Sequence, residues 1–381
     1  MIKLTALVKK FRLKFSLPGK SPVVIYDKAG ELVLRQFLGP SVQPVVLDIR
    51  DVVYLSPKIV LNLALLLVSK KNKSGLWSRA GLRVCYEHAL ISSLDPDLVI
   101  NHSEANIRFG LLSRLYRSAR FIGVQNGYRQ SEINETAPLN YLTNAFCFGQ
   151  EVIDNYRRAG ANIQNFFILG SLSDGLYREA KGGGPEAPGF DICLISQYRR
   201  NRFDRETREL AEITATLMNF LGEFCEKHNK SCVIAGNAKK GLEADREREF
   251  YKEWLKDPHF VFRPNDRSSF STYAAIDASN VVICVNSTAG IEALGRGKKL
   301  LFSNFSKNQF FDIQGKYKDG VWALSNACPD YEEFEKRLFD LLLLSREEWA
   351  NVSREFSTYF IFCDEERYPQ DVLREHLFGH S

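Results

Sequence analysis

The stretch that decides the fold is Val281-Val-Ile-Cys-Val-Asn-Ser-Thr-Ala-Gly-Ile-Glu-Ala-Leu-Gly-Arg-Gly-Lys-Lys-Leu-Leu-Phe302. It predicts a buried strand, a sharp turn, a helix that opens near Ala289 and a second buried strand. Ser287 and Thr288 are residue types that cap the free backbone N–H groups of a helix start, and Gly290 would let a ligand approach there. An anionic phosphate would find N–H donors and a favourable helix dipole at this point.

Glu292 follows Thr288 by four residues, so both lie on the same face of the predicted helix. A hydroxyl-bearing group joined to the phosphate, such as a ribose, would lie within reach of the Glu292 carboxylate. An ordinary capped helix of an α/β domain with an exposed Glu explains the same residues. The two interpretations agree on local structure and differ only in the ligand.

Short apolar runs alternate with helically spaced segments along most of the chain. Such alternation is typical of βαβ units, so we expect an α/β fold with parallel sheets. In the first half we expect strands at 23–26, 45–47, 98–101, 121–124, 145–148 and 167–169, and helices at 57–70, 105–118 and 151–159. In the second half we expect strands at 192–195, 232–235, 259–262, 281–284 and 300–302, and helices at 205–227, 242–255, 270–276 and 288–295.

A change of composition divides the chain. Residues 181–189 contain four Gly and two Pro, which is typical of a linker or surface loop. Two Rossmann-like domains would then face a cleft at the carboxyl ends of their strands, where open α/β sheets bind ligands. The predicted division is an N-terminal segment at 1–20, a first domain at 21–170, a linker at 171–189, a second domain at 190–330 and C-terminal helices at 331–381.

The composition excludes several other classes of protein. The chain has 381 residues, 45% hydrophobic and 25% charged, which suits a globular protein of two domains. A net charge of +5 is too small to indicate nucleic-acid binding by itself, and no RNA-binding module is visible. The 8 Cys and 6 His are scattered, so we expect core thiols in a reducing compartment and no metal site. No phosphate loop or nicotinamide fingerprint occurs, and no cofactor is expected.

The first 20 residues are basic and amphipathic. Six Lys or Arg alternate with apolar residues, and no acidic residue occurs among them. We expect residues 1–20 to lie on the anionic inner face of the cytoplasmic membrane, with a first helix that has a solvated basic face as the alternative. The apolar run 59–68 is too short to span a bilayer and is predicted to be a buried helix face. The expected location is the cytoplasm, with peripheral membrane association.

Polar clusters follow the expected strands of the second half. A phosphate ester needs cationic groups and N–H donors, and these clusters would bring both to one edge of the sheet. Any single Arg or Lys among them is better explained as a solvated surface residue, so the prediction depends on several of them lying together. The candidate nucleotide-binding residues are Gln197, Arg199, Arg200, Gly236, Lys239 and Arg263, together with Ser287, Thr288, Gly290 and Glu292.

Polar residues also follow strands of the first half, at Asp27, Glu104 and the loop Gln125-Asn-Gly-Tyr-Arg129. Amides such as those of Gln125 and Asn126 suit sugar hydroxyls, Gly127 permits close approach, and Arg129 completes this candidate acceptor site. Glycosyl transfer to a hydroxyl needs a base for the acceptor proton if configuration inverts. Glu104 and Asp27 are the candidate bases, and each is equally explained as a carboxylate that caps a helix or closes a loop.

Two resemblances add to this interpretation. The stretch 281–302 resembles the donor-nucleotide site of GT-B glycosyltransferases, in which the helix Glu binds the ribose. Over about residues 20–310 the chain resembles bacterial surface-carbohydrate (O-antigen type) biosynthesis proteins. The motifs that carry this second resemblance are Val24-Ile-Tyr-Asp-Lys-Ala-Gly30, Pro96-Asp-Leu-Val-Ile-Asn101, Phe121-Ile-Gly-Val-Gln-Asn-Gly-Tyr-Arg129 and Leu169-Gly-Ser171.

The resemblance implies a GT-B-like fold. It also bears on which residue would act as the base that accepts the acceptor proton. Related GT-B transferases place a His before the Gly of the 121–129 loop, where this chain has Asn126, which cannot act as a base. In the surface-carbohydrate family an acidic residue and Asn occupy the loop that matches Ser103-Glu-Ala-Asn106, which favours Glu104 over Asp27.

The sequence therefore predicts a GT-B-like, metal-independent glycosyltransferase. It would transfer a sugar from a nucleotide-sugar donor to a growing surface glycan or its lipid-linked precursor. The second domain would hold the donor, and the first would hold the acceptor and supply the base. A GT-B nucleotide-sugar 2-epimerase and a non-catalytic scaffold of a polysaccharide assembly complex are the alternatives.

Overall fold

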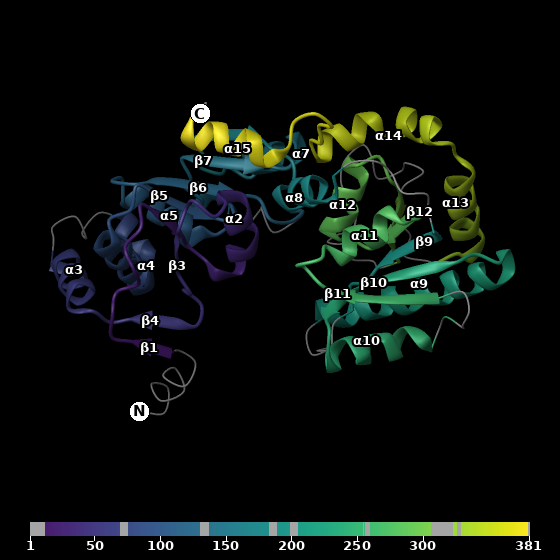
Figure 1. Ribbon diagram of the computed structural model, residues 1–381, viewed down its shortest axis with the longest axis horizontal. Coiled ribbons are helices and arrows are strands. Elements are labelled where there is room, and N and C mark those ends of the chain that lie inside the picture. Colours follow the sequence, from purple (N-terminus) through teal and green to yellow (C-terminus); the bar gives the residue numbers. More distant parts are fainter. Residues whose placement is uncertain are drawn as a thin grey trace. The chain divides into compact units, whose positions relative to one another are not determined.

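The computed structural model describes residues 12–68, 75–129, 137–182, 189–198, 205–253, 255, 260–305, 323–325 and 329–379. The chain forms two compact units. Unit 1 comprises Met1–Leu176 and Arg367–Ser381, and unit 2 comprises Tyr177–Glu366. Each unit contains one six-stranded sheet with helices packed against it (Figure 1).

Unit 1 is built on a sheet of order β3-β2-β5-β6-β7-β8 in which every neighbouring pair is parallel. All residues of β2 and β5 are buried, as expected for apolar strands whose two faces are both covered. The strands are β2 (Val23–Ile25), β3 (Val45–Val46), β5 (Leu98–Asn101), β6 (Arg120–Val124), β7 (Asn144–Cys147) and β8 (Asn165–Ile168). A separate parallel pair joins β1 (Arg12–Lys14) to β4 (Val52–Tyr54).

The helices of unit 1 include one from the far end of the sequence. In α15 the His376 ring lies 4.3 Å from the ring of Phe167 and 5.0 Å from that of Phe146, so α15 packs on β7 and β8 (yellow, Figure 1). The elements are η1 (Lys28–Gly30), α2 (Glu31–Leu38), α3 (Pro57–Val68), α4 (Gly75–Leu94), α5 (Ile107–Leu115), η3 (Ala137–Leu139), α7 (Gln150–Arg158), α8 (Leu172–Lys181), which runs into unit 2, and α15 (Pro369–Phe378).

Unit 2 repeats this design with a parallel sheet of order β11-β10-β9-β12-β13-β14. The stretch 281–302 supplies strand, helix and next strand, as predicted. The strands are β9 (Phe190–Ile195), β10 (Cys232–Lys239), β11 (Phe260–Asn265), β12 (Ser279–Cys284), β13 (Lys299–Asn304) and β14 (Ala323–Ser325). The helices are α9 (Arg205–His228), α10 (Leu242–Lys252), α11 (Ser271–Asp277), α12 (Thr288–Gly295), α13 (Tyr331–Leu343) and α14 (Arg346–Phe360).

The predicted fold class is confirmed, since the chain forms two Rossmann-like units with parallel sheets. Cysteines behave as predicted too: seven are free thiols, and all but Cys363 of these are buried. Cys328 lies outside the described residues.

The structure differs from the predicted linker. Of residues 171–189, those from Leu172 to Lys181 form helix α8, and the division between the units falls inside it. The Gly- and Pro-rich composition that suggested a linker is confined to the end of this range, after the helix. The predicted C-terminal helices exist, but α15 belongs to unit 1 while α13 and α14 belong to unit 2.

Two further expectations for unit 1 are changed. Within the N-terminal segment, Arg12–Lys14 form strand β1 instead of a helix, because their backbone pairs with β4; residues 1–11 lie outside the described part. The apolar run 59–68 was predicted to be buried, yet in α3 only Ile59 is buried. Of the helices that the structure describes, none has the length and apolarity needed to cross a membrane.

The docking of α15 on unit 1 depends on a glycine. A Cβ on Gly175 would lie 2.7 Å from the Cδ atom of Pro369 and still closer to the side chain of Gln370, which donates to the Gly175 carbonyl at 3.2 Å. We expect Gly175→Ala to lower the free energy of unfolding by about 1–3 kcal/mol, because the helices must move apart. Urea unfolding measures this change. Gly189→Ala, where no heavy atom lies within 4 Å of the new Cβ, is the control and should be near neutral.

Candidate functional site

The turn between β12 and α12 is held by a side chain from β9. Gln197 follows β9; its Oε1 atom accepts hydrogen bonds from Val285 N at 3.1 Å and Asn286 N at 3.0 Å. Its Nε2 atom donates to Asn286 Oδ1 at 2.6 Å. Gln197, a predicted nucleotide-binding residue, is thus a positioning residue that fixes the backbone leading into α12.

The start of α12 is capped differently from the prediction. Ser287 is the N-cap residue, but its side chain makes no capping hydrogen bond; its carbonyl accepts from Gly290 N at 2.9 Å. A Cβ on Gly290 would collide with the Sγ atom of Cys284, so packing of α12 on β12 accounts for this glycine. Thr288 is the first helical residue, and both it and Ser287 are half-buried.

Glu292 is not the exposed residue that an ordinary surface helix would carry. It is 4% exposed, and its Oε2 atom accepts a hydrogen bond from the Tyr273 hydroxyl at 2.9 Å. The Tyr273 ring stacks on Tyr177 with a centroid distance of 5.0 Å, and the guanidinium of Arg296 lies 5.2 Å from the Tyr273 ring. This packing fixes the Tyr273 hydroxyl and hence the carboxylate of Glu292, one turn into α12.

A second buried carboxylate holds the end of β10. Glu247 is fully buried; its oxygens accept from Asn237 N at 2.9 Å and Ala238 N at 2.7 Å, and from the hydroxyl of Ser196. A Cβ on Gly236 would lie 2.8 Å from Phe262 Cζ and 2.9 Å from a backbone oxygen of β11, so close strand packing explains Gly236.

The Arg and Lys residues predicted to gather at one edge of the unit 2 sheet are only partly found there in the described structure. Lys239 is exposed at the end of β10. The guanidinium of Arg263 lies 5.4 Å from the ring of Phe190, the first residue of β9, so it points back toward the amino end of the sheet. Arg263 therefore does not join the other cationic residues at the carboxyl ends of the strands, because its side chain packs over an aromatic ring. Arg199 and Arg200 lie outside the described residues.

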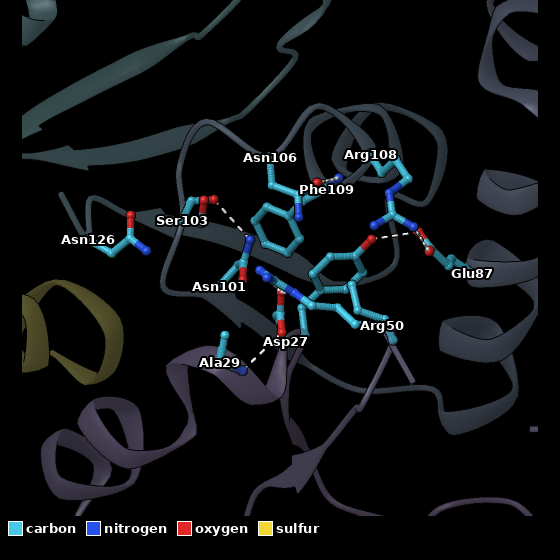
Figure 2. Close-up of polar contacts among 12 residues, drawn as sticks. Asp27, Ala29, Arg50, Glu87, Asn101, Ser103, Asn106, Arg108, Phe109 and Asn126 are labelled. Atoms are coloured by element: carbon cyan, nitrogen blue, oxygen red, sulfur yellow. Dashed lines mark hydrogen bonds and ion pairs between the residues drawn. The ribbon is translucent and has the colours of Figure 1, made fainter. Parts of the chain in front are cut away.

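In unit 1, Asp27 already has partners. It is 4% exposed; its Oδ1 atom accepts from Ala29 N at 2.9 Å, which caps η1, and its Oδ2 atom pairs with Arg50 at 2.6 Å. Figure 2 shows Asp27 and Arg50 beside Asn101, at the carboxyl ends of β2 and β5. These contacts give Asp27 the capping and loop-closing role that the sequence left open.

Glu104 is tied to two residues of neighbouring elements. It is fully buried, and its Oε1 atom accepts from Arg129 Nε at 3.2 Å and from the Tyr156 hydroxyl at 3.0 Å. The backbone carbonyl of Glu104 accepts from Asn140 at 2.9 Å. Its Oε2 atom has no hydrogen-bond partner among the residues that the structure describes.

The loop after β6 combines buried and exposed residues. Gln125 is buried; it accepts from Phe148 N at 2.6 Å and donates to the carbonyl of Gly127 at 2.8 Å, so it joins this loop to the end of β7. Asn126 is exposed and accepts from Arg129 at 2.5 Å. Arg129 thus links the buried Glu104 to the exposed Asn126, and Asn126 is the residue of this loop most open to a ligand.

Glu151 is a titratable residue that is not among the candidates predicted from the sequence. It opens α7 directly after β7 and is 6% exposed; its Oε1 atom accepts from Asn155 at 2.5 Å. Its Oε2 atom has no partner in the described part of the chain. Burial raises the pKa of Glu151 to about 7. Its position at a strand end is the same signal that selected Asp27 and Glu104.

The described residues contain no group of three or more His, Cys, Asp or Glu side chains arranged as metal ligands. The polar residues of both units instead gather at the carboxyl ends of the sheets. In unit 2 they surround the start of α12, and in unit 1 they follow β2, β5, β6 and β7. This is where open parallel sheets bind small molecules.

A family model described as "putative O-antigen biosynthesis protein" matches residues 122–356, more than half of the chain. The chain therefore belongs to this family of O-antigen biosynthesis proteins. No curated protein matches it.

Solved structures share its fold at low sequence identity. A structure titled as a UDP-N-acetylglucosamine 2-epimerase from Listeria monocytogenes has a TM-score of 0.55 and 16% identity, over 95% of this chain and 98% of that one. The S. aureus MnaA–UDP structure has a TM-score of 0.55 and 11% identity, over 94% and 96%. The Neisseria meningitidis UDP-GlcNAc 2-epimerase bound to UDP-GlcNAc has a TM-score of 0.53 and 12% identity, over 94% and 99%. The fold is therefore GT-B-like.

The raised pKa of Glu151 predicts a pH-dependent stability. Between about pH 4.5 and pH 7 the folded protein holds a proton that the unfolded chain releases, so the free energy of unfolding falls as pH rises. We expect the wild type to lose about 3 kcal/mol relative to Glu151→Gln between pH 4.5 and pH 8. Urea unfolding of both proteins across this range measures the difference. Parallel pH profiles would show that Glu151 ionises normally in the fold.

Proposed function

We propose that this protein is a nucleotide-sugar-dependent glycosyltransferase of surface-polysaccharide assembly. The observation that carries the proposal is Glu292, a buried carboxylate on α12, fixed by Tyr273 beside a turn that Gln197 holds. The Tyr273 hydroxyl orients this carboxylate through its Oε2 atom, and an ionised carboxylate accepts up to about four hydrogen bonds, which suits it to ligand hydroxyls. Membership of the O-antigen biosynthesis family supports the same kind of substrate.

In this proposal unit 2 binds the donor. The phosphates lie at the start of α12, where the N–H groups of Thr288 and Ala289 and the helix dipole favour an anion, and Lys239 adds a positive charge nearby. The ribose hydroxyls bind Glu292. No metal or other cofactor takes part, so these groups must offset the phosphate charge.

Unit 1 holds the acceptor through Asn126 and Arg129. The acceptor oxygen attacks the anomeric carbon, the bond from that carbon to the phosphate oxygen breaks, and the acceptor proton passes to a carboxylate. Asp27 and Glu104 are each ion-paired with an arginine, so both carboxylates already have a charged partner within the fold. Glu151, with a pKa of about 7 and an oxygen that has no partner in the described structure, is the better proton acceptor.

A GT-B nucleotide-sugar 2-epimerase is the second candidate. The observation that favours it is the similarity of fold, over 94–95% of this chain, to structures titled as UDP-GlcNAc 2-epimerases or solved with UDP. Both reactions would use the same donor site. They differ in whether the sugar leaves the nucleotide.

The first test is nucleotide binding. Calorimetry with UDP, GDP, CDP, CMP and dTDP identifies the nucleotide that binds most tightly, and Glu292→Gln should weaken its binding roughly ten- to a hundredfold. The reason is the loss of a charged hydrogen bond to the ribose. Glu243→Gln, which removes an exposed charge from α10, is the control and should bind as the wild type does. Equal affinities for all three proteins would refute the donor site, and no binding to the wild type would favour the scaffold.

The second test separates the two reactions. We expect a nucleotide sugar incubated without acceptor to remain unchanged, and free nucleoside diphosphate to appear only when membrane-extracted glycan lipids are added. Ion-exchange chromatography and proton NMR of the sugar measure both outcomes. Formation of the 2-epimer without acceptor would establish the epimerase instead.

A further inference from the structure

Helix α3 presents an entirely apolar face to its surroundings. Its exposed positions from the second turn onward are one contiguous stripe, because at 100° per residue they cover about half of the helix circumference. Exposure reaches 62% at Leu65 and 86% at Val68, whereas exposed large apolar residues elsewhere mostly occur singly. The stripe consists of Val60, Leu61, Ala64, Leu65, Leu67 and Val68.

The polar side chains of α3 bind α4 instead, although Lys58 is itself exposed. Lys58 Nζ donates to the carbonyl of Ser93 at 2.7 Å, and Asn62 Nδ2 donates to the Ser93 hydroxyl at 2.8 Å. Ile59, on the same side, is buried. These contacts with α4 fix the rotation of α3, so the outward apolar stripe is a specified feature of the fold. A water-exposed helix normally has the opposite arrangement.

A basic, partly apolar strand, β1, pairs with β4, the strand that leads into this helix. Lys14 pairs with Tyr54, and Leu55 N donates to the Lys14 carbonyl at 2.7 Å, so Phe15 lies beside Leu55, two residues before α3 begins. Phe15 is 75% exposed and the Arg12 side chain 70% exposed. Directly after α3 the sequence contains three Lys and no acidic residue in residues 69–74. Basic residues therefore precede and follow the apolar stripe, although Arg12 is paired with Asp48 at 3.2 Å and Lys14 supplies the charge before it.

We propose that the outer face of α3, with Phe15 beside it, inserts into the headgroup region of an anionic lipid bilayer. Twelve helical residues are about 18 Å long, too short to span a bilayer but suited to lying in its surface. Apolar side chains enter the lipid, and the basic border meets the lipid phosphates. A second copy of the chain fits less well, since a twofold contact would bring the two basic borders together.

This inference goes beyond the proposed transferase and does not depend on it. The membrane contact needs no nucleotide, no acceptor and no residue of the candidate site. It also differs from attachment through residues 1–20 alone, which depends on six basic residues and would weaken at high salt. Insertion of apolar side chains should persist there.

The test is co-sedimentation of the full-length protein with vesicles made of equal amounts of phosphatidylglycerol and phosphatidylethanolamine. We expect the wild type to bind, with a fraction that resists high salt. Leu61→Glu and Leu65→Glu should each lower the partition coefficient roughly tenfold or more. Leu343→Glu is the matched control, because Leu343 is a 70% exposed leucine on α13, and it should bind as the wild type does. All substituted leucines are exposed, so circular dichroism should show intact folding.

Three results would overturn the proposal. One is a wild type that stays in the supernatant. Another is equal binding of the wild type, Leu61→Glu and Leu65→Glu, with complete release of all three at high salt, which would assign the contact to the basic N-terminal segment. The third is a wild-type dimer in light scattering that Leu65→Glu converts to a monomer without changing vesicle binding, which would make α3 an interface between copies.

Discussion

Buried and half-buried side-chain acceptors that bind backbone N–H groups hold the loops at the carboxyl ends of both sheets. Glu247 binds two amides at the end of β10, and Gln197 binds two amides between β12 and α12. Gln125 does the same for an amide after β7. A loop that leaves a strand end has N–H groups without a ladder partner, and a buried one would cost free energy if left unpaired. These side chains satisfy the amides and fix the segments that lead into α12 and α7 and the end of β10.

This constraint explains why several predicted ligand-binding residues have structural roles. Gln197 and Gln125 have the hydrogen-bonding groups that a ligand would need, but both use them within the fold. Asp27 is likewise occupied by a cap and an ion pair. Glu292 and Asn126 remain the better candidates for direct contact, since Tyr273 orients the buried Glu292 carboxylate beside the start of α12 and Arg129 orients the exposed Asn126 amide. The surrounding loops position the Glu292 carboxylate and the Asn126 amide, as the supporting residues around a binding site do.

The sequence could predict the fold because its signals are local and repeated. Apolar runs such as 98–101 and 281–284 are strands in the structure, and the segments between them are mostly helices. The candidate sites were found by the rule that polar residues follow strands, which applies to Glu151 as well as Glu104. What the sequence could not predict is where side chains point. Arg263 is predicted to lie at a strand end facing a ligand, yet its guanidinium packs over Phe190, which lies far earlier in the sequence, and Gly290 packs against Cys284 of the preceding strand.

The apolar run in α3 is another case in which the sequence does not predict where side chains point, since residues expected to be buried are exposed. Periodicity reports that one side of a helix is apolar, but it does not report whether that side meets protein or lipid. Short polar anchors decide the matter here: the bonds from Lys58 and Asn62 to Ser93 turn the apolar stripe outward. Had those polar residues been on the outside, hydrophobic burial would have favoured the stripe packed on α4. The two hydrogen bonds on one face of α3 therefore turn its other, apolar face away from the protein, where we propose that lipid covers it.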